Sequence, residues 1–129
     1  MATVLVIDDD DDVRKLIARA LAERYDVIEA SDAAAALALA ADRRLDLIVC
    51  DVMMPRMSGF ELVRELRARD GGNHVPIVFL TAKSGAMDVV EGINAGARAY
   101  VTKPFKLAPL VERIEKILAT PRGAAGQSR

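Results

Sequence analysis

The stretch that decides the fold is Val4-Leu5-Val6-Ile7-Asp8-Asp9, a short apolar run that ends in two carboxylates. Three later apolar runs also end beside a polar residue that could act on a phosphoryl group: Leu47-Ile48-Val49-Cys50 before Asp51, Ile77-Val78-Phe79-Leu80 before Thr81, and Tyr100-Val101 before Thr102 and Lys103. All strands of an open parallel sheet finish at one edge, so residues spread along the sequence meet in one crevice there. The pattern therefore predicts a site with three carboxylates, a hydroxyl group and an ammonium group.

Short β-type runs alternate with helix-type stretches five times along the chain. The expected strands cover residues 4–7, 26–30, 46–50, 76–80 and 99–102. Such alternation requires right-handed crossovers and a parallel sheet that helices cover on both faces. The first, third and fourth runs are almost wholly apolar and should be central, whereas residues 25–29 alternate and suit an edge. We therefore predict an α/β fold, a three-layer α/β/α sandwich whose five-stranded parallel sheet has the order 2-1-3-4-5.

Helix boundaries between these strands are also marked. The aspartates at 10–12 stand where a helix N-terminus favours negative charge, and Ser31 or Asp32 can cap the alanine-rich residues 33–41. Residues 58–61 form a capping box. The remaining markers are Ser84 and Gly96, which can start and end a fourth helix, and Thr120-Pro121, which closes a fifth.

Length and composition bound what the chain can be. At 129 residues it is one domain long, and we expect residues 1–119 to form that domain and residues 120–129 to be a flexible tail or the start of a linker. The formal net charge is -1 and no long basic run is present, so we expect a protein partner and no direct nucleic-acid binding. Strand-like sequence begins at Val4 and no apolar run approaches the roughly 20 residues of a membrane helix, so we expect a cytoplasmic location without membrane contact. The single cysteine, Cys50, lies in an apolar run and should be a buried, inert thiol.

The converging residue types suit a magnesium-dependent reaction of a phosphoryl group. Mg²⁺ prefers oxygen ligands, and Asp8, Asp9 and Asp51 supply three carboxylates. Two carboxylates about 4 Å apart repel by roughly 4 kcal/mol at an effective dielectric constant of 20, so a bound cation would relieve the cluster. With the metal on one side and Lys103 on the other, charge on the phosphoryl oxygens would be neutralised, which leaves the Asp51 carboxylate free to attack phosphorus.

Each of these residues also has an ordinary structural explanation. The aspartates at 10–12 suit helix caps or solvated charge, Thr81 suits a strand-end hydroxyl, and Lys103 suits a surface charge. Asp51 is harder to explain in this way, because it directly follows an apolar strand and precedes Val-Met-Met-Pro. Only the combination of these residues is specific.

That combination resembles the receiver domain of two-component response regulators, the CheY-like proteins with a flavodoxin-like (βα)5 fold. The resemblance covers residues 3 to about 119. It rests on residues 4–9, Asp51-Val-Met-Met-Pro55 with Gly59, Thr81-Ala82, Ala95-Gly-Ala97, Tyr100 and Lys103-Pro-Phe105. CheY is itself a known example of the strand order 2-1-3-4-5, so the predicted order and the resemblance are not independent.

For the site, the resemblance implies that Asp51 is the phosphoacceptor and takes a phosphoryl group from a histidine of a sensor kinase or a phosphotransfer protein. Asp9 and Asp51 would bind Mg²⁺, or Mn²⁺ in its place. Asp8 would act largely through a water, and the Met53 backbone carbonyl would complete the protein ligands. Lys103 would pair with Asp51 at rest and with the phosphoryl group afterward.

For signalling, the resemblance implies a switch. Thr81 would hydrogen-bond a phosphoryl oxygen and make room for Tyr100 to turn from solvent toward the core; the alternative role for Tyr100 is a half-buried strand aromatic. The fourth helix, fifth strand and fifth helix would then act on a downstream protein or an output domain, as a monomer or a phosphorylation-dependent homodimer. Gly59 would be structural, as would Pro104, which follows Lys103 through a bond that is cis in many relatives. Such a domain is not an enzyme, because it catalyses only its own phosphotransfer and self-dephosphorylation.

Several positions depart from the family's pattern. Arg98-Ala99 stands where many DNA-binding relatives have two acidic residues, which removes a feature of their charged dimer interface. Ser58 replaces a common aspartate, although it can still cap its helix. Met53 and Lys83 occupy positions where relatives tune the loss of the phosphoryl group. Neither side chain orients water well, so slow self-dephosphorylation is expected.

Other classes of protein fit the sequence less well. A haloacid-dehalogenase-type phosphatase also uses a strand-end aspartate with Mg²⁺, but it normally needs a second acid two residues on, where this chain has Met53. A nucleotide- or flavin-binding domain would need a glycine-rich phosphate loop after residues 4–7, where five aspartates stand. A receiver-like domain that only binds partners would lack phosphorylation residues, and here none is missing.

Overall fold

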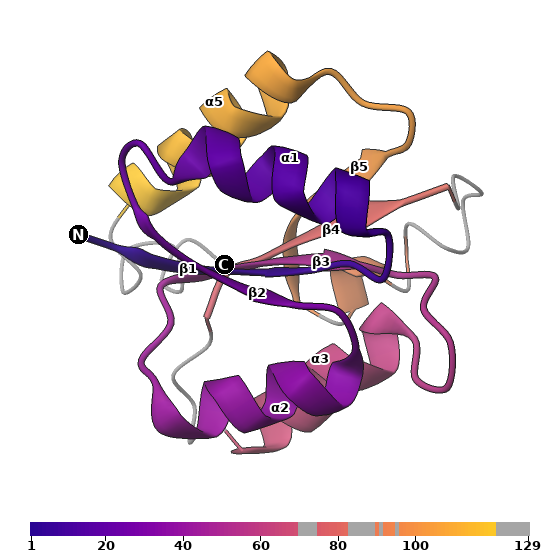
Figure 1. Ribbon diagram of the computed structural model, residues 1–129. Helices are drawn as coiled ribbons and strands as arrows, with labels where there is room; N and C mark the ends of the chain where they lie inside the picture. The colour runs from indigo at the N-terminus through magenta and orange to yellow at the C-terminus, as the bar shows by residue number, and fades with distance from the viewer. Residues whose placement is uncertain (70–74, 83–89, 91, 95, 121–129) are drawn as a thin grey trace.

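The computed structural model describes residues 1–69, 75–82, 90, 92–94 and 96–120. Its sheet has five parallel strands, β1 (Thr3–Ile7), β2 (Asp26–Ala30), β3 (Leu47–Asp51), β4 (Ile77–Thr81) and β5 (Ala97–Thr102). Their order is β2-β1-β3-β4-β5, as predicted. Figure 1 shows helices on both faces of the sheet: α1 (Asp11–Leu21) and α5 (Leu107–Ala119) on one, α2 (Ala33–Asp42) and α3 (Gly59–Arg69) on the other. The predicted three-layer α/β/α sandwich is confirmed.

Both faces of the sheet are buried, because each strand sends alternate side chains to opposite sides. In β1, Leu5 and Ile7 pack with residues of α2 and α3, whereas Val4 and Val6 pack with residues of α1 and α5. Every residue of β3 and β4 is buried, while β2 and β5 are partly exposed. The central and edge positions of the strands therefore agree with the apolar pattern. In the two fully buried strands, the polar residues Asp51 and Thr81 stand at the carboxyl ends.

Several strand boundaries differ from the prediction by one or two residues, including those of β3, β4 and β5. β3 includes Asp51 instead of ending before it, so the predicted phosphoacceptor is itself the last residue of a buried strand. β4 begins at Ile77, after Pro76, because a proline has no N–H to donate to a ladder. β5 begins at Ala97, two residues early, and its register with β4 skips Arg98. Periodicity gave no sign of that irregularity.

The predicted caps place the helix starts near the carboxyl ends of the strands. Asp10 caps α1 and accepts a hydrogen bond from the Asp12 N–H at 3.0 Å. Asp32 caps α2 and accepts from the Ala35 N–H at 2.7 Å, which decides between the two predicted capping residues. The capping box over residues 58–61 is present, with bonds of 3.1 and 3.2 Å. These turns carry the chain from each strand end into the helix that follows.

Some predicted features lie outside the described residues. These are most of the fourth helix, with Ser84, and also Lys83 and residues 121–129. Gly96 is described and has the expected left-handed conformation, with a φ of 95°. Within the described ranges, no helix combines the length and the apolar character needed to cross a membrane.

Candidate metal centre at the carboxyl edge of the sheet

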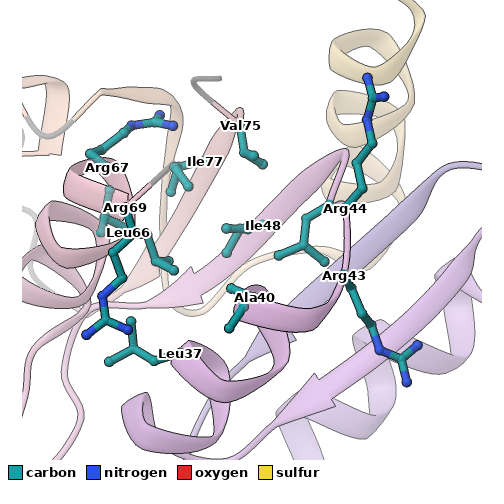
Figure 2. Close-up of a pocket in the computed structure, with 13 residues that line it drawn as sticks. Leu37, Ala40, Arg43, Arg44, Ile48, Leu66, Arg67, Arg69, Val75 and Ile77 are labelled. Atoms are coloured by element: carbon teal, nitrogen blue, oxygen red, sulfur yellow. The ribbon is translucent and has the colours of Figure 1, made fainter. Parts of the chain in front are cut away.

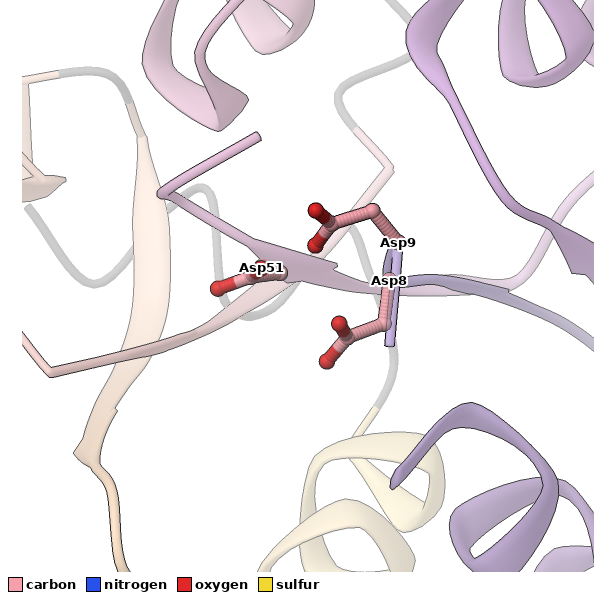
Figure 3. A group of neighbouring side chains, drawn as sticks. All are labelled: Asp8, Asp9 and Asp51. Carbon is pink, nitrogen blue, oxygen red and sulfur yellow. The ribbon is translucent and has the colours of Figure 1, made fainter. Parts of the chain in front are cut away.

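Three carboxylates meet where β1 and β3 end (Figure 3). Asp8 and Asp9 follow β1 directly and Asp51 ends β3; one carboxylate oxygen from each lies within 4.8 Å of the others. Asp8 and Asp51 are 0% and 4% exposed, while Asp9 is exposed to solvent. The structure thus brings together the three acids that the sequence places at one edge. Their role as metal ligands stays a prediction.

Lys103 reaches these acids from the residue after β5. Its Nζ donates a hydrogen bond to Asp8 Oδ2 at 3.1 Å and lies 3.5 Å from Asp51 Oδ1. The expected pair of Lys103 with Asp51 is present, and Lys103 makes a second, shorter contact with Asp8. The Lys103 N–H donates to the Thr81 carbonyl at 2.8 Å, and the bond to Pro104 is cis, as in many relatives. The carboxyl ends of β4 and β5 therefore hold the ammonium group of Lys103 beside Asp8 and Asp51.

The charge of Lys103 is maintained by its neighbours. Burial alone would lower the pKa of Lys103, but the hydrogen bond to Asp8 and the negative charges of Asp51 and Asp8 outweigh burial and raise this pKa. The side chain is 24% exposed, so it lies at the mouth of the site and not deep within it. Lys103 is therefore a permanent cation between two acids.

The Asp51 carboxyl group is hard to ionise in the metal-free protein. Burial, followed by the negative charge of Asp8, raises the pKa of Asp51 from 3.8 to about 7. Lys103 and the Met53 N–H lower this pKa, while a hydrogen bond with Asp9 raises it. One ammonium group thus compensates only part of the electrostatic strain that three neighbouring acids create.

The donor set fits Mg²⁺, because three carboxylates supply hard oxygen ligands and, among the described residues, Lys103 is the one cation that the structure places against them, so negative charge remains in excess. The two oxygens of Asp8 are engaged by the Asp10 N–H at 2.9 Å and by Lys103, which suits the indirect role implied for Asp8. Asp9 and Asp51 would then supply the direct carboxylate ligands. The Met53 N–H is 3.4 Å from Asp51 Oδ1, so the Met53 backbone lies beside the site. Its carbonyl as a further ligand stays a prediction.

The two predicted switch residues lie on neighbouring strands. Thr81 ends β4 and is fully buried, one residue beyond Leu80, which is the register partner of Asp51. Tyr100 is partly buried on β5, with its ring centroid 6.4 Å from those of Phe60 and Phe79. In this structure the Tyr100 ring therefore packs against the core. Its movement stays a prediction.

Gly59 begins α3 against the end of β3. Its N–H donates to the Val52 carbonyl at 2.8 Å. A Cβ at this position would lie 2.3 Å from the Asp51 carbonyl oxygen and 2.9 Å from the Val52 Cα. These are backbone atoms that cannot rotate aside, so only glycine permits this approach of α3 to the strand. Gly59 therefore has the structural role that the resemblance implies.

Arg14 belongs to the site, although reasoning from the sequence missed it. On α1, its guanidinium donates to the Asp8 carbonyl at 2.9 Å and to Glu29 at 3.0 Å, and it pairs with Asp11 at 2.7 Å. A signal was available, because Arg14 precedes the buried Ile17 by three positions and so lies on the inner face of its helix. An arginine there is expected to be paired.

A well-defined cavity lies away from this site. It has a volume of about 330 Å³ and lies between α2 and α3, near the amino ends of β3 and β4. Figure 2 shows apolar side chains at its centre and arginines at its periphery, with the guanidinium groups of Arg43 and Arg44 directed away from that centre. None of the predicted site residues lines it, so the candidate site is the acidic edge.

Comparisons with known sequences agree with this description. Residues 4–115 match the sequence profile of a family described as "Response regulator receiver domain". The chain is 43% identical over 128 residues to "Response regulator MprA" of Mycolicibacterium vanbaalenii, covering 97% of this chain and 54% of that protein. It is 44% identical over 126 residues to "Transcriptional regulatory protein PrrA" of Mycobacterium tuberculosis, covering 97% and 53%. The chain spans about half the length of these curated relatives.

Solved structures with the same fold match over nearly their whole length. The chemotaxis protein CheY4 of Vibrio cholerae has a TM-score of 0.85 at 35% identity, covering 91% of this chain and 98% of that one. The receiver domain of the Francisella response regulator 1452 has a TM-score of 0.84 at 32% identity, covering 92% and 98%.

Proposed function

This chain belongs to the response regulator receiver domain family, and we propose that it accepts a phosphoryl group from a phosphohistidine onto Asp51. The observation that supports the proposal is the convergence of Asp51 with Asp8, Asp9 and Lys103 at one edge of the sheet. Response regulators act in two-component systems, so the donor would be a sensor histidine kinase or a phosphotransfer protein.

The proposed reaction exchanges one bond to phosphorus for another. A carboxylate oxygen of Asp51 attacks phosphorus and forms a P–O bond, while the P–N bond to the donor histidine breaks and its electron pair remains on the imidazole nitrogen. Mg²⁺ bound by the acids would neutralise charge on the phosphoryl oxygens. Lys103, 3.5 Å from Asp51, is close enough to donate to one of those oxygens once they are attached. Because the product is the modified protein itself, we propose a signalling domain and not an enzyme with a separate substrate.

The proposed output depends on a change of packing near β4 and β5. A phosphoryl group on Asp51 would offer Thr81 a new hydrogen-bond partner that exists in only one of two packings, so phosphorylation would shift the population between them. The Tyr100 side chain on the neighbouring strand would change its position with the packing and so alter the surface. Since the chain spans about half of its curated relatives, the target would be a downstream protein or an output domain. PrrA is named a transcriptional regulatory protein. If this chain belongs to a protein of that kind, the output domain would be the part that binds DNA.

The proposal is tested by intact-mass analysis after incubation with acetyl phosphate, a small phosphoryl donor. We expect a single phosphoryl adduct that forms with Mg²⁺, forms also with Mn²⁺, and disappears when EDTA removes the metal. The control is a receiver domain that is known to be labelled under the same conditions. If the control is labelled and this chain is not, the proposal is wrong, and a domain that binds partners without phosphorylation becomes the better description.

Loss of the phosphoryl group should be slow. Water must approach Asp51 past Met53, whose side chain is 54% exposed and carries only a weak acceptor, so it cannot orient the attacking water. We expect the adduct to persist for minutes or longer at neutral pH after the donor is removed, as followed by mass spectrometry. The Met53→Asn variant should lose it faster, while Met57→Asn should not. A wild-type half-life of seconds would contradict this expectation.

A further inference from the structure

Arg14 makes three contacts that join three separate segments around the acidic edge. Nη1 donates to the Asp8 carbonyl at 2.9 Å, Nε donates to Glu29 on β2 at 3.0 Å, and Nη2 pairs with Asp11 in the first turn of α1 at 2.7 Å. The side chain is only 10% exposed. A planar guanidinium can hold this many acceptors at once because its donors have a fixed fork geometry.

The contact with the Asp8 carbonyl fixes the peptide that carries Asp9. That carbonyl belongs to the planar unit between Asp8 and Asp9, so its direction sets the direction of the Asp9 N–H and Cα. On the other side of Asp8, its N–H donates to the Ala30 carbonyl at 3.2 Å. Asp8 is thus held on both sides, and the orientation of the next peptide depends on Arg14.

Asp9 is the one member of the acidic cluster that needs such support. Asp8 and Asp51 are buried and have backbone or lysine partners, whereas Asp9 is exposed at the start of the loop into α1 and meets the cluster through its hydrogen bond with Asp51. Its carboxylate still lies within 4.8 Å of the other two. A fixed backbone limits the positions that this exposed side chain can take.

We propose that Arg14 is a positioning residue for the metal: by donating to the Asp8 carbonyl, it holds the Asp8–Asp9 peptide so that the Asp9 carboxylate joins Asp8 and Asp51. The inference rests on the proposed function in taking Mg²⁺ as the ion bound there. The charge of Arg14 is not what helps the metal, because a nearby cation repels a dication. The flanking carboxylates of Asp11 and Glu29 offset that charge, and the directed hydrogen bond remains as its contribution.

The Arg14→Lys variant separates geometry from charge, because lysine keeps the positive charge but cannot make the three contacts together. The matched control is Arg24→Lys. Arg24 forms an ion pair with Glu115, and its side chain is 69% exposed. Dissociation constants for Mg²⁺ would be measured by calorimetry or by amide shifts in NMR spectra. We expect Arg14→Lys to bind Mg²⁺ about tenfold more weakly, the size of effect seen when groups that orient metal ligands are removed, and Arg24→Lys to bind as the wild type does.

Two further measurements distinguish positioning from a general structural role. Saturating Mg²⁺ should restore the wild-type yield of the acetyl phosphate adduct in Arg14→Lys, because only the metal affinity is altered. In the metal-free protein, the amide protons of Asp9 and Asp10 should exchange faster in this variant, while those of β3 should not. Unchanged Mg²⁺ affinity, an equal loss in Arg24→Lys, or an adduct that saturating Mg²⁺ does not restore would each overturn the inference.

The inference can fail separately from the proposed function. If the wild type binds no Mg²⁺ and forms no adduct, the function is wrong, and the exchange of the Asp9 and Asp10 amides in metal-free protein still decides whether Arg14 orders that peptide. If Arg14→Lys does not unfold cooperatively, Glu29→Gln replaces it, since this change weakens one anchor of the guanidinium at a partly exposed carboxylate. A smaller loss of Mg²⁺ affinity in the same direction is then expected, and wild-type affinity would overturn the inference.

Discussion

The Asp51→Asn variant should form no phosphoryl adduct and should be more stable than the wild type in metal-free buffer at pH 8. The adduct is lost because an amide is not a nucleophile comparable to a carboxylate. Stability rises because the wild type must keep a buried carboxylate ionised beside Asp8. Lys103 keeps its shorter contact, with Asp8 at 3.1 Å, so the substitution leaves no buried cation without a partner.

The pH dependence follows from the sign of the pKa shift. The pKa of Asp51 is raised from 3.8 to about 7 in the folded protein. Between these values the folded protein holds a proton that the unfolded chain has released, so stability falls as pH rises through this window and stays low above it. At pH 8 the difference between variant and wild type should be on the order of 2 kcal/mol, since one pKa unit corresponds to about 1.4 kcal/mol and solvent screens part of the repulsion.

Thermal and urea unfolding at several pH values between 4 and 8 would measure this difference. We expect the difference in stability between the variant and the wild type to shrink toward pH 4. Added Mg²⁺ should stabilise the wild type more than the variant, because the metal binds only the folded site and the variant lacks the Asp51 carboxylate as a ligand. Asp42→Asn, the same change at an exposed position in α2, is the control. Parallel pH profiles for wild type and Asp51→Asn would show that Asp51 is an ordinary carboxyl group.

The Gly59→Ala substitution should destabilise the protein by about 2 to 3 kcal/mol and slow formation of the adduct. The added methyl would lie 2.3 Å from the Asp51 carbonyl oxygen, so either α3 or the end of β3 must move. Overpacking of this kind typically costs about 1 to 3 kcal/mol, and here both neighbouring atoms are backbone. The movement would displace Asp51, the proposed nucleophile, and misplacement of reacting groups by about 1 Å can cost a hundredfold in rate.

Ser58→Ala is the comparison for Gly59→Ala, because it weakens the same helix start without a clash. Ser58 accepts a hydrogen bond from the Glu61 N–H at 3.2 Å, and the loss of such a cap costs about 1 kcal/mol. Urea unfolding and the initial rate of adduct formation at saturating Mg²⁺ would be measured for both variants. A Gly59→Ala protein with the stability and rate of Ser58→Ala would show that the backbone relaxes without cost.

The fold could be predicted because its signals are periodic and local. Apolar runs, their spacing and the caps at Asp10 and Asp32 identify strands and helix starts without knowledge of any contact. The same logic brings Asp8, Asp9 and Asp51 together, because the ends of parallel strands share an edge whatever the side chains are.

What could not be predicted depends on distances between elements. The reach of Arg14 to Glu29 requires knowing how closely α1 passes over β2, and a pattern of burial does not contain that distance. The preference of Lys103 for Asp8 over Asp51 is a difference of 0.4 Å between contacts of 3.1 and 3.5 Å. The early start of β5 depends on an irregular register beside Arg98, which leaves no trace in hydropathy.

Asp51 ends a strand in which every residue is buried, whereas β5, two positions away in the sheet, is buried only at Ala99. Local opening costs least where few apolar contacts must be broken. We therefore expect the strand that carries the proposed phosphoacceptor to be among the last to open, and β5 among the first. If a phosphoryl group is added at Asp51, we expect the buried strand beneath it to stay in place and β5, at the edge of the sheet, to change its packing where a partner could bind.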